Sequence, residues 1–207
     1  MTKGFFLLFF ISSLVYWVFG WFLIPKLRYC RRSTKGPKPS GKTVSLIIPA
    51  RNEEARLTPL LDSLNAEGAF EKHEVILADD GSTDGTAALA SSYGCRVLAV
   101  TDKPPVALGK SWACAAGAAG ATGEYLVFLD ADVVFLPGGL EAVLESYSGG
   151  LLSVQPYHRF KRFYESFSAY FNLMAVAGVN SFSLHSKELS SQGAFGPCMV
   201  CRKDDYL

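Results

Sequence analysis

Two aspartates one residue apart, Asp130 and Asp132, directly follow the apolar run Tyr125–Leu129. An apolar run of this length is typical of a buried strand, and open α/β sheets bind their ligands at the carboxyl ends of strands. If the backbone stays extended through Ala131, both carboxylates leave the same face and can reach one divalent cation. Mg²⁺ or Mn²⁺ would suit, because hard cations prefer carboxylate and phosphate oxygens. The alternative is that both residues are solvated acids of an ordinary loop.

Polar residues also follow the first two predicted strands. Residues 44–53 read VSLIIPARNE, an apolar strand that ends in three polar side chains, and the second strand ends in Asp79 and Asp80. Ser82 or Asp84 would cap the helix that follows. Capping does not explain the adjacent acids, because two carboxylates at a buried strand end are costly unless a ligand binds them. A nucleoside, with its N–H and hydroxyl donors, would satisfy one of them.

Lys110 lies in Gly109-Lys-Ser, which resembles the end of a P-loop. The P-loop pattern needs a glycine where this chain has Pro104, so a mononucleotide P-loop is disfavoured. Lys110 at a helix N-terminus would still reach a phosphate as a point charge, or else be an ordinary solvated lysine. No G-x-G-x-x-G follows any strand, which argues against a nicotinamide dehydrogenase.

Apolar runs alternate with helical segments over the middle of the chain. Four β-α units in succession predict an α/β fold with a mostly parallel, doubly wound sheet flanked by helices. Continuous apolar strands indicate that helices cover both faces of this sheet. The expected strand and helix pairs are 44–48 with 53–64, 75–78 with 83–93, 97–100 with 110–121, and 125–129 with 138–146.

The N-terminus predicts a membrane anchor. Residues 4–24 contain no charge and have the length of a helix that crosses a bilayer; a cleaved signal peptide is the alternative. Seven basic residues follow in 25–42, so the positive-inside rule places the remainder in the cytoplasm, at the cell membrane. The expected division is an anchor over 1–25, a basic linker over 26–42 and one domain over 43–207. Five cysteines form an odd set without framework spacing, which fits a reducing compartment.

The C-terminal third has a different character. Residues 160–184 are aromatic and apolar at helical spacing, and form either a core helix or, as we favour, a helix at the membrane interface. Residues 192–207 predict a loop, a short strand and the start of a helix. Cys198 and Cys201 have C-x-x-C spacing without a second pair, so packing is favoured over a redox or metal role. A net charge of +1 does not suggest nucleic acid as a partner.

Four stretches together resemble the inverting family 2 glycosyltransferases with the GT-A fold. They are VSLIIPARNEE, VILADDGSTDGT, GKSWACAAGAAGATGEYLVFLDADV and GAFGPCMVCRKDDYL, and the resemblance covers residues 44–207. The anchored chain is most similar to bacterial membrane enzymes that glycosylate carotenoid or other polyprenoid-type lipids. The resemblance implies a sugar transfer from a nucleotide-sugar donor, expected to be a UDP-sugar, to a lipid or membrane-associated acceptor with inversion.

The resemblance also assigns roles to individual residues. The nucleotide pocket would be lined by Pro49, Ala50 and Glu53, and the uracil edge would meet Asp79 or Asp80. Lys110 would lie near the base or the diphosphate. Asp130 would approach the ribose, and Asp132 would bind the metal ion, Mg²⁺ or Mn²⁺.

One part of the family pattern has no match. Family members carry a later acidic motif whose aspartate deprotonates the acceptor, and many then carry Q-x-x-R-W. Asp204 and Asp205 come too early for that motif, and His158 and His185 have no supporting partner. The chain is therefore expected to be an N-terminal portion that holds the donor site without the base. The alternatives are a catalytically inactive nucleotide-sugar-binding or membrane-interaction protein, and a nucleotidyltransferase, whose Gly-rich basic loop after the first strand is not found here.

Overall fold

The chain divides into two compact units, residues 1–29 with 157–194 and residues 30–156 with 195–207. The computed structural model describes residues 2–23, 29–30, 43–101, 104, 109–157 and 193–207. Helix α1 (Thr2–Leu23) belongs to the first unit and exposes apolar side chains such as Phe6, Leu8 and Trp17. None of the helices in these ranges is sufficiently long and apolar to span a membrane. The anchor over 1–25 stays a prediction, and the helix over 160–184 lies outside the described residues.

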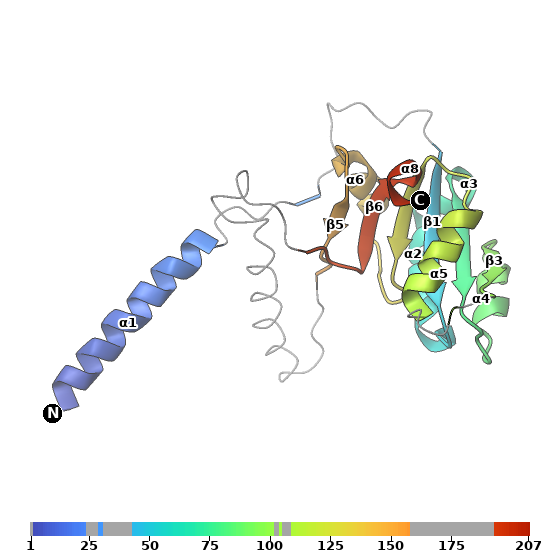
Figure 1. Cartoon of the computed structure of the whole chain (residues 1–207). Helices are drawn as coiled ribbons and strands as arrows, with labels where there is room; N and C mark the ends of the chain where they lie inside the picture. Colours follow the sequence, from blue (N-terminus) through green and yellow to red (C-terminus); the bar gives the residue numbers. More distant parts are fainter. Residues whose placement is uncertain (1, 24–28, 31–42, 102–103, 105–108, 158–192) are drawn as a thin grey trace. The chain divides into compact units, whose positions relative to one another are not determined.

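The second unit is built on one six-stranded sheet with the strand order β3-β2-β1-β4-β6-β5 (Figure 1). The first four strands are parallel, whereas β6 runs antiparallel to β4 and β5 antiparallel to β6. The mostly parallel α/β fold is therefore confirmed, with an antiparallel edge that periodicity did not predict. The strands are β1 (Val44–Ala50), β2 (Glu74–Asp79), β3 (Arg96–Ala99), β4 (Tyr125–Leu129), β5 (Leu152–Val154) and β6 (Cys198–Arg202).

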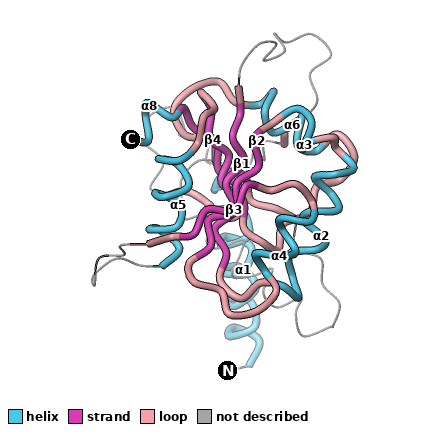
Figure 2. The backbone as a smooth tube through the Cα atoms, turned by 90° about the vertical axis from the view of Figure 1, so that its right-hand side faces the viewer, coloured by secondary structure: helices cyan, strands magenta, loops and turns pink. Residues whose placement is uncertain are grey.

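Helices cover both faces of the sheet, as the apolar strands require. Viewed along the sheet, α5 and α8 lie on one side, and α2, α4 and α6 on the other (Figure 2). The helices are α2 (Glu54–Ala66), α3 (Ala69–Lys72), α4 (Thr86–Ser92), α5 (Gly109–Gly120), α6 (Gly139–Ser146) and α8 (Lys203–Tyr206). Helix α4 begins three residues later than expected. Asp84 lies before it and accepts hydrogen bonds from the N–H and hydroxyl of Thr86, so the preceding residues form a loop.

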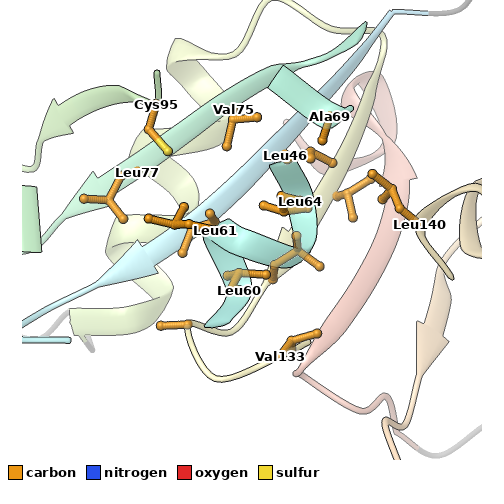
Figure 3. Packing of buried hydrophobic residues seen from close by; sticks show 14 of the residues in the cluster. Leu46, Leu60, Leu61, Leu64, Ala69, Val75, Leu77, Cys95, Val133 and Leu140 are labelled. Atoms are coloured by element: carbon orange, nitrogen blue, oxygen red, sulfur yellow. The ribbon is translucent and has the colours of Figure 1, made fainter. Parts of the chain in front are cut away.

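Alternate residues of β1 enter two separate cores. Leu46 and Ile48 pack with Leu60, Leu61 and other leucines of α2, as Figure 3 shows for Leu46, Leu60 and Leu61. Ile47 faces the opposite side and packs against α5. All are fully buried, and burying a leucine or isoleucine side chain stabilises a fold by about 1.5–3 kcal/mol. This two-sided burial explains why the strand sequence is continuously apolar rather than alternating.

Strand β6 inserts between β4 and β5 and extends the sheet beyond the four β-α units. Its residue Cys198 enters the core on the α2 side, whereas Cys201 enters the core on the α5 side. Burial raises the pKa of Cys198 to about 12 and also raises that of Cys201. The two thiols lie on opposite faces and stay protonated, which supports packing as the role of this C-x-x-C spacing.

Candidate functional site

A cavity of about 390 Å³ opens at the carboxyl ends of β1, β2 and β4, where the N-terminus of α5 also lies. This volume lies within the range of small-molecule binding sites. The lining consists of backbone and side chains from the three strand ends, α2 and α5: Pro49, Ala50, Arg51, Glu53, Arg56, Asp80, Gly109, Lys110, Ala113, Asp130, Ala131 and Asp132. Parallel strands bring these residues to one edge although they are distant in sequence.

The loops after β1 and β2 are joined by hydrogen bonds between side chains and backbone. Asn52 has a φ of 55°, a left-handed conformation that asparagine tolerates. Its N–H donates to Ser82 Oγ (3.0 Å), and its Oδ1 accepts the N–H of Thr83 (2.8 Å). The N–H of Glu53 donates to Thr86 Oγ1 (2.9 Å). These bonds hold the two loops, and the strand ends that precede them, in one arrangement.

Lys110 and Asp130 form an ion pair across the cavity. Lys110 is the second residue of α5, and its Nζ lies 2.6 Å from Asp130 Oδ1. The lysine side chain is 58% exposed and the aspartate 24%. Partly exposed pairs of this kind are typically worth about 1 kcal/mol or less, so the lysine can exchange its carboxylate for a ligand phosphate at small cost. Cys114, one turn further along α5, has its pKa raised to about 11 by burial and is no nucleophile at neutral pH.

The charges around the cavity are almost balanced. Arg51 lies 3.7 Å from Asp80, and Arg56 lies 3.9 Å from Glu53. These two pairs and the Lys110–Asp130 pair account for three of the four carboxylates that line the cavity, so one carboxylate remains. It is Asp132, which is exposed and, among the residues that the structure describes, has no ion-pair partner. The lining holds three basic and four acidic side chains, so its formal charge is one negative, and the excess lies at Asp132.

Most of the residues predicted from the sequence lie together in this cavity. Seven of the eight line it: Pro49, Ala50, Glu53, Asp80, Lys110, Asp130 and Asp132. Asp79 is not among the lining residues, and its Oδ1 accepts the N–H of Ser82 at 3.0 Å. Of the two acids considered for nucleobase recognition, Asp80 is thus the one at the cavity. Their roles in binding stay predictions.

Sequence reasoning did not assign a role to the two arginines of the lining. Arg51 follows directly on the strand end, and Arg56 lies three residues after Glu53, the spacing of neighbours on a helix. Both signals are readable in the sequence. Alone they do not distinguish a binding residue from an ordinary surface residue, because arginine is common on solvated helix and loop surfaces.

The donor atoms at Asp130 and Asp132 suit a hard divalent cation but do not complete a site. Within the described ranges, no three histidine, cysteine, aspartate or glutamate side chains are grouped so that they could hold a metal ion. Such an ion usually takes about six oxygen ligands. A cation at this edge would therefore need oxygens from a ligand and from water.

Solved structures to which this chain is similar are glycosyltransferases, and they show that its fold is of the GT-A type. A mannosyltransferase from Pyrobaculum calidifontis, determined with GDP-mannose and Mn²⁺, matches 94% of this chain and 53% of its own, with a TM-score of 0.59 and 21% identity. Glucosyl-3-phosphoglycerate synthase from Mycobacterium tuberculosis, determined with Mn²⁺, UDP and glucosyl-3-phosphoglycerate, matches 81% of this chain and 59% of its own. Its TM-score is 0.53 and its identity 23%. At these identities the likeness concerns the fold.

The family model of glycosyl transferase family 2 matches residues 45–206, and the chain belongs to this family of sugar-transferring enzymes. Its curated relatives include 4,4'-diaponeurosporenoate glycosyltransferase from Staphylococcus aureus, 47% identical over 171 residues. That match covers 80% of this chain and 45% of the relative. The chain thus spans about half the length of the curated relatives that it matches. The family resemblance inferred from the four sequence stretches is confirmed.

Proposed function

We propose that the cavity binds a nucleotide-sugar donor and that the protein transfers the sugar to a lipid-like acceptor. The observation that carries this proposal is the meeting of Lys110, Asp130 and Asp132 at the carboxyl edge of the sheet. The named donors of the solved neighbours support a nucleotide, and the Staphylococcus relative supports a carotenoid-type acceptor. We propose UDP as the nucleotide and inversion as the stereochemical course.

Each charged group of the lining has a proposed task in holding the donor. Lys110 leaves Asp130 to bind a phosphate oxygen, and Asp130 then accepts hydrogen bonds from the ribose hydroxyls. Asp80, whose side chain is only 13% exposed, accepts from the base. Glu53, Pro49 and Ala50 line the nucleotide. Buried hydrogen-bonding groups of this kind discriminate strongly, because a wrong base leaves them unpaired.

The charge of the lining supports a divalent cation. A diphosphate adds negative charge to a cavity that is already one charge negative, so binding is unfavourable without an added cation. Asp132, the carboxylate that lacks a partner in the described structure, would hold Mg²⁺ or Mn²⁺ together with diphosphate oxygens. When bound, the metal would neutralise charge on the leaving diphosphate. An acceptor oxygen, such as a carboxylate oxygen, would bond to the anomeric carbon from the side opposite to the diphosphate while the bond to the diphosphate breaks, which gives inversion.

Calorimetry of UDP binding tests this proposal. The purified chain is expected to bind UDP about tenfold or more tightly in Mn²⁺ than in EDTA, and a tenfold ratio is equivalent to about 1.4 kcal/mol of binding free energy. Asp132→Ala is expected to bring that ratio close to one. Glu71→Gln, a change at an exposed acid of α3, is the control and should keep the ratio of the native chain. Equal UDP affinity of the native chain in EDTA and in Mn²⁺ would refute the proposal.

We also propose that residues 1–25 anchor the protein in the cell membrane with the sheet domain in the cytoplasm. The support is the uncharged stretch 4–24 and the seven basic residues in 25–42. Protease added to intact cells should spare the domain, and added after lysis should digest it. Cleavage by protease from outside intact cells would refute this orientation.

The non-catalytic alternative gains no support from the comparisons, because the curated relatives are named as glycosyltransferases. Product analysis separates the two functions. Transfer of sugar to a lipid acceptor by the protein, with the anomeric configuration read by proton NMR, tests both the activity and its inversion. Donor binding without transfer by a protein that also includes the later acidic motif would favour a binding protein, since a donor-binding portion without the base is itself expected to transfer little.

A further inference from the structure

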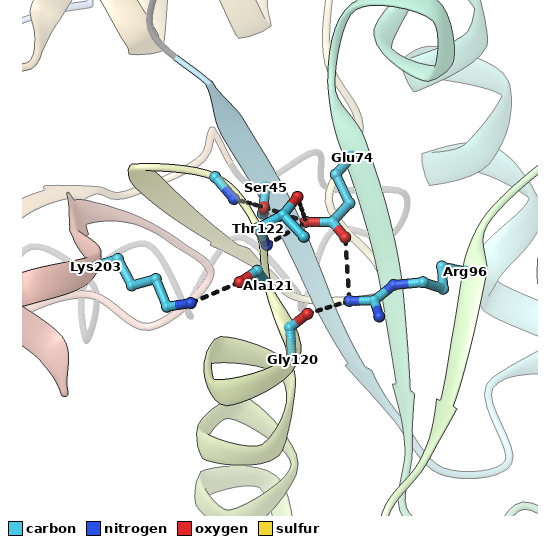
Figure 4. Close-up of polar contacts among 8 residues, drawn as sticks. Ser45, Glu74, Arg96, Gly120, Ala121, Thr122 and Lys203 are labelled. Carbon is cyan, nitrogen blue, oxygen red and sulfur yellow. Dashed lines mark hydrogen bonds and ion pairs between the residues drawn. The ribbon is translucent and has the colours of Figure 1, made fainter.

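Glu74 is the centre of a hydrogen-bond network (Figure 4). The network lies at the amino end of β2, whereas the cavity lies at the carboxyl ends of the strands. It is the first residue of β2, and its Oε2 accepts hydrogen bonds from the Ser45 hydroxyl (2.5 Å) and from the N–H (2.8 Å) and hydroxyl (2.9 Å) of Thr122. Its Oε1 lies 3.1 Å from Arg96. Burial opposes the charged form, but these hydrogen bonds and the arginine together lower the pKa of Glu74. We call Ser45, Glu74, Arg96 and Thr122 the Glu74 network.

This network holds the C-terminal end of α5. Thr122 follows directly on that end, and the Arg96 guanidinium, already paired with Glu74, donates to the carbonyl of Gly120. Lys203 of α8 donates to the carbonyl of Ala121 (2.6 Å). The last carbonyls of a helix lack partners within the helix and carry its negative dipole end, so cations stabilise them. Four other elements, β1, β2, β3 and α8, thereby fix this end of α5.

The composition of α5 explains why the position of its end matters. The helix reads GKSWACAAGAAG, and the residues that it buries are Ala113, Cys114, Gly117 and Ala118. A Cβ on Gly117 would come within 2.5 Å of Ile47 Cγ2, so the helix lies very close to β1. Small side chains fit closely but interdigitate little with the sheet. Packing alone therefore resists sliding of α5 along its axis less than large side chains would.

The opposite end of α5 carries Lys110. With a rise of about 1.5 Å per residue, Lys110 lies roughly 15 Å from the end of the helix, so the two ends share no direct contact. An α-helix is stiff along its axis, and a displacement at one end appears at the other. Trp112 Nε1, which donates to the carbonyl of Thr101 (3.2 Å), is a further contact near the N-terminal end. A misplacement of about 1 Å at a charged contact is sufficient to weaken it strongly.

We propose that Glu74 is a positioning residue for donor binding: by holding the C-terminal end of α5, it sets the place of Lys110 at the cavity. This proposal rests on the proposed function, in which Lys110 contacts a donor phosphate. Residues that share no contact normally act additively on binding. Glu74 and Lys110 should not be additive, because Glu74 acts through Lys110.

A double-mutant cycle measures this coupling. UDP affinity in the presence of Mn²⁺ is measured by calorimetry for the native chain, Glu74→Gln, Lys110→Ala and the double variant, with melting temperatures in parallel. Glu74→Gln is expected to weaken UDP binding about three- to tenfold in the native background, and by less than about twofold in the Lys110→Ala background. Glu124→Gln is the matched control. It lies at the same edge, pairs with Arg202 at 3.9 Å, and should leave UDP affinity unchanged.

Three results would overturn the proposal. Glu74→Gln could weaken UDP equally in both backgrounds, or lower the melting temperature without changing affinity; either result means that Glu74 is only structural. Lys110→Ala could leave UDP affinity unchanged, which removes Lys110 from the donor site and the positioning role with it. The proposed function would then still be tested independently, by the effect of Asp132→Ala on the metal dependence of UDP binding.

A second variant keeps the test decisive if Glu74→Gln does not fold. Thr122 is exposed, and Thr122→Val removes its hydroxyl while its N–H stays available to Glu74. It should weaken UDP binding about twofold in the native background and leave it unchanged in Lys110→Ala. An equal effect in both backgrounds would overturn the positioning role.

Discussion

Gly117 allows α5 to approach the sheet, and its replacement by alanine gives a sharp test of that packing. A Cβ at this position would lie 2.5 Å from Ile47 Cγ2, whereas ordinary contacts begin at 3.4 Å. Ile47 is fully buried and β-branched, so it has little rotamer freedom with which to move away. Gly120, in the same helix, provides a matched control. A Cβ there would meet its nearest neighbour, Leu98 Cδ2, at 3.4 Å.

Two opposing effects determine how much each glycine-to-alanine substitution changes the stability of the fold. Alanine is the better helix former by about 0.8–1.0 kcal/mol, and this gain applies to both positions, although less fully at the last residue of the helix. Overpacking of a filled core costs about 1–3 kcal/mol, and this cost applies to Gly117 alone. Gly117→Ala is therefore expected to be less stable than Gly120→Ala by about 1–3 kcal/mol. For a domain of this size, that difference lowers the melting temperature by roughly 2–12 °C.

Thermal unfolding of the two purified variants under the same conditions measures this difference. Gly120→Ala should melt at or slightly above the temperature of the native chain, and Gly117→Ala below that of Gly120→Ala. Because α5 must move away from β1 to admit the new methyl group, UDP affinity should fall in Gly117→Ala alone. Equal melting temperatures of the two variants would refute the close packing of α5 on Ile47.

Two further predictions concern the two acids at the end of β2 and a partly buried histidine. Asp80→Asn should weaken UDP binding and reduce the preference for UDP over other nucleotides, whereas Asp79→Ala should mainly lower the stability of the fold, by about 1 kcal/mol, because Ser82 loses its acceptor. Competition calorimetry with four nucleotides measures the first effect, and urea unfolding measures the second. An unchanged nucleotide preference in Asp80→Asn would contradict the assignment of Asp80 to the base. His73 has its pKa lowered by burial and by the charge of Lys72, and its Nδ1 is shielded from solvent and has no hydrogen-bond partner among the residues that the structure describes. The imidazole of His73 therefore binds a proton more readily in the unfolded chain than in the folded one. The contribution of neutral His73 to the stability of the fold is complete above about pH 6.5 and is lost as the pH falls below that value. His73→Gln should flatten that part of the stability profile in urea unfolding; an unchanged slope would show that another group titrates there.

The parallel half of the sheet was predictable from the sequence because its signals are local. Strands β1 to β4 are each built on a mostly apolar run, and β1, β2 and β4 are followed by polar residues that line the cavity. The carboxyl ends of parallel strands meet at one edge, so Lys110, Asp130 and Asp132 could be grouped before their geometry was known.

The remaining features depend on pairing between distant segments. Nothing in the sequence of residues 198–202 indicates that β6 pairs with β4 rather than forming a separate hairpin. The bonds from Asn52 to Ser82 and Thr83 also join loops about thirty residues apart, and each of these residues alone has the composition of an ordinary turn. Glu74 directly precedes the apolar run 75–78, and its partners Ser45, Arg96 and Thr122 lie in segments that are distant in the sequence.

The insertion of β6 next to β4 has a consequence for the order in which the protein folds during synthesis. Strands β1 to β4 leave the ribosome in sequence and can pair as neighbours, but the open side of β4 is completed only by residues 198–202. The backbone of Asp130 depends on the same late segment, since its N–H donates to the carbonyl of Pro197 (3.0 Å). Pairing over such a separation is slow, and an unpaired strand edge is exposed until it forms. The acidic end of β4 therefore reaches its final geometry last, and a nascent chain shorter than about 200 residues presents an open strand next to the place where the folded domain has its cavity.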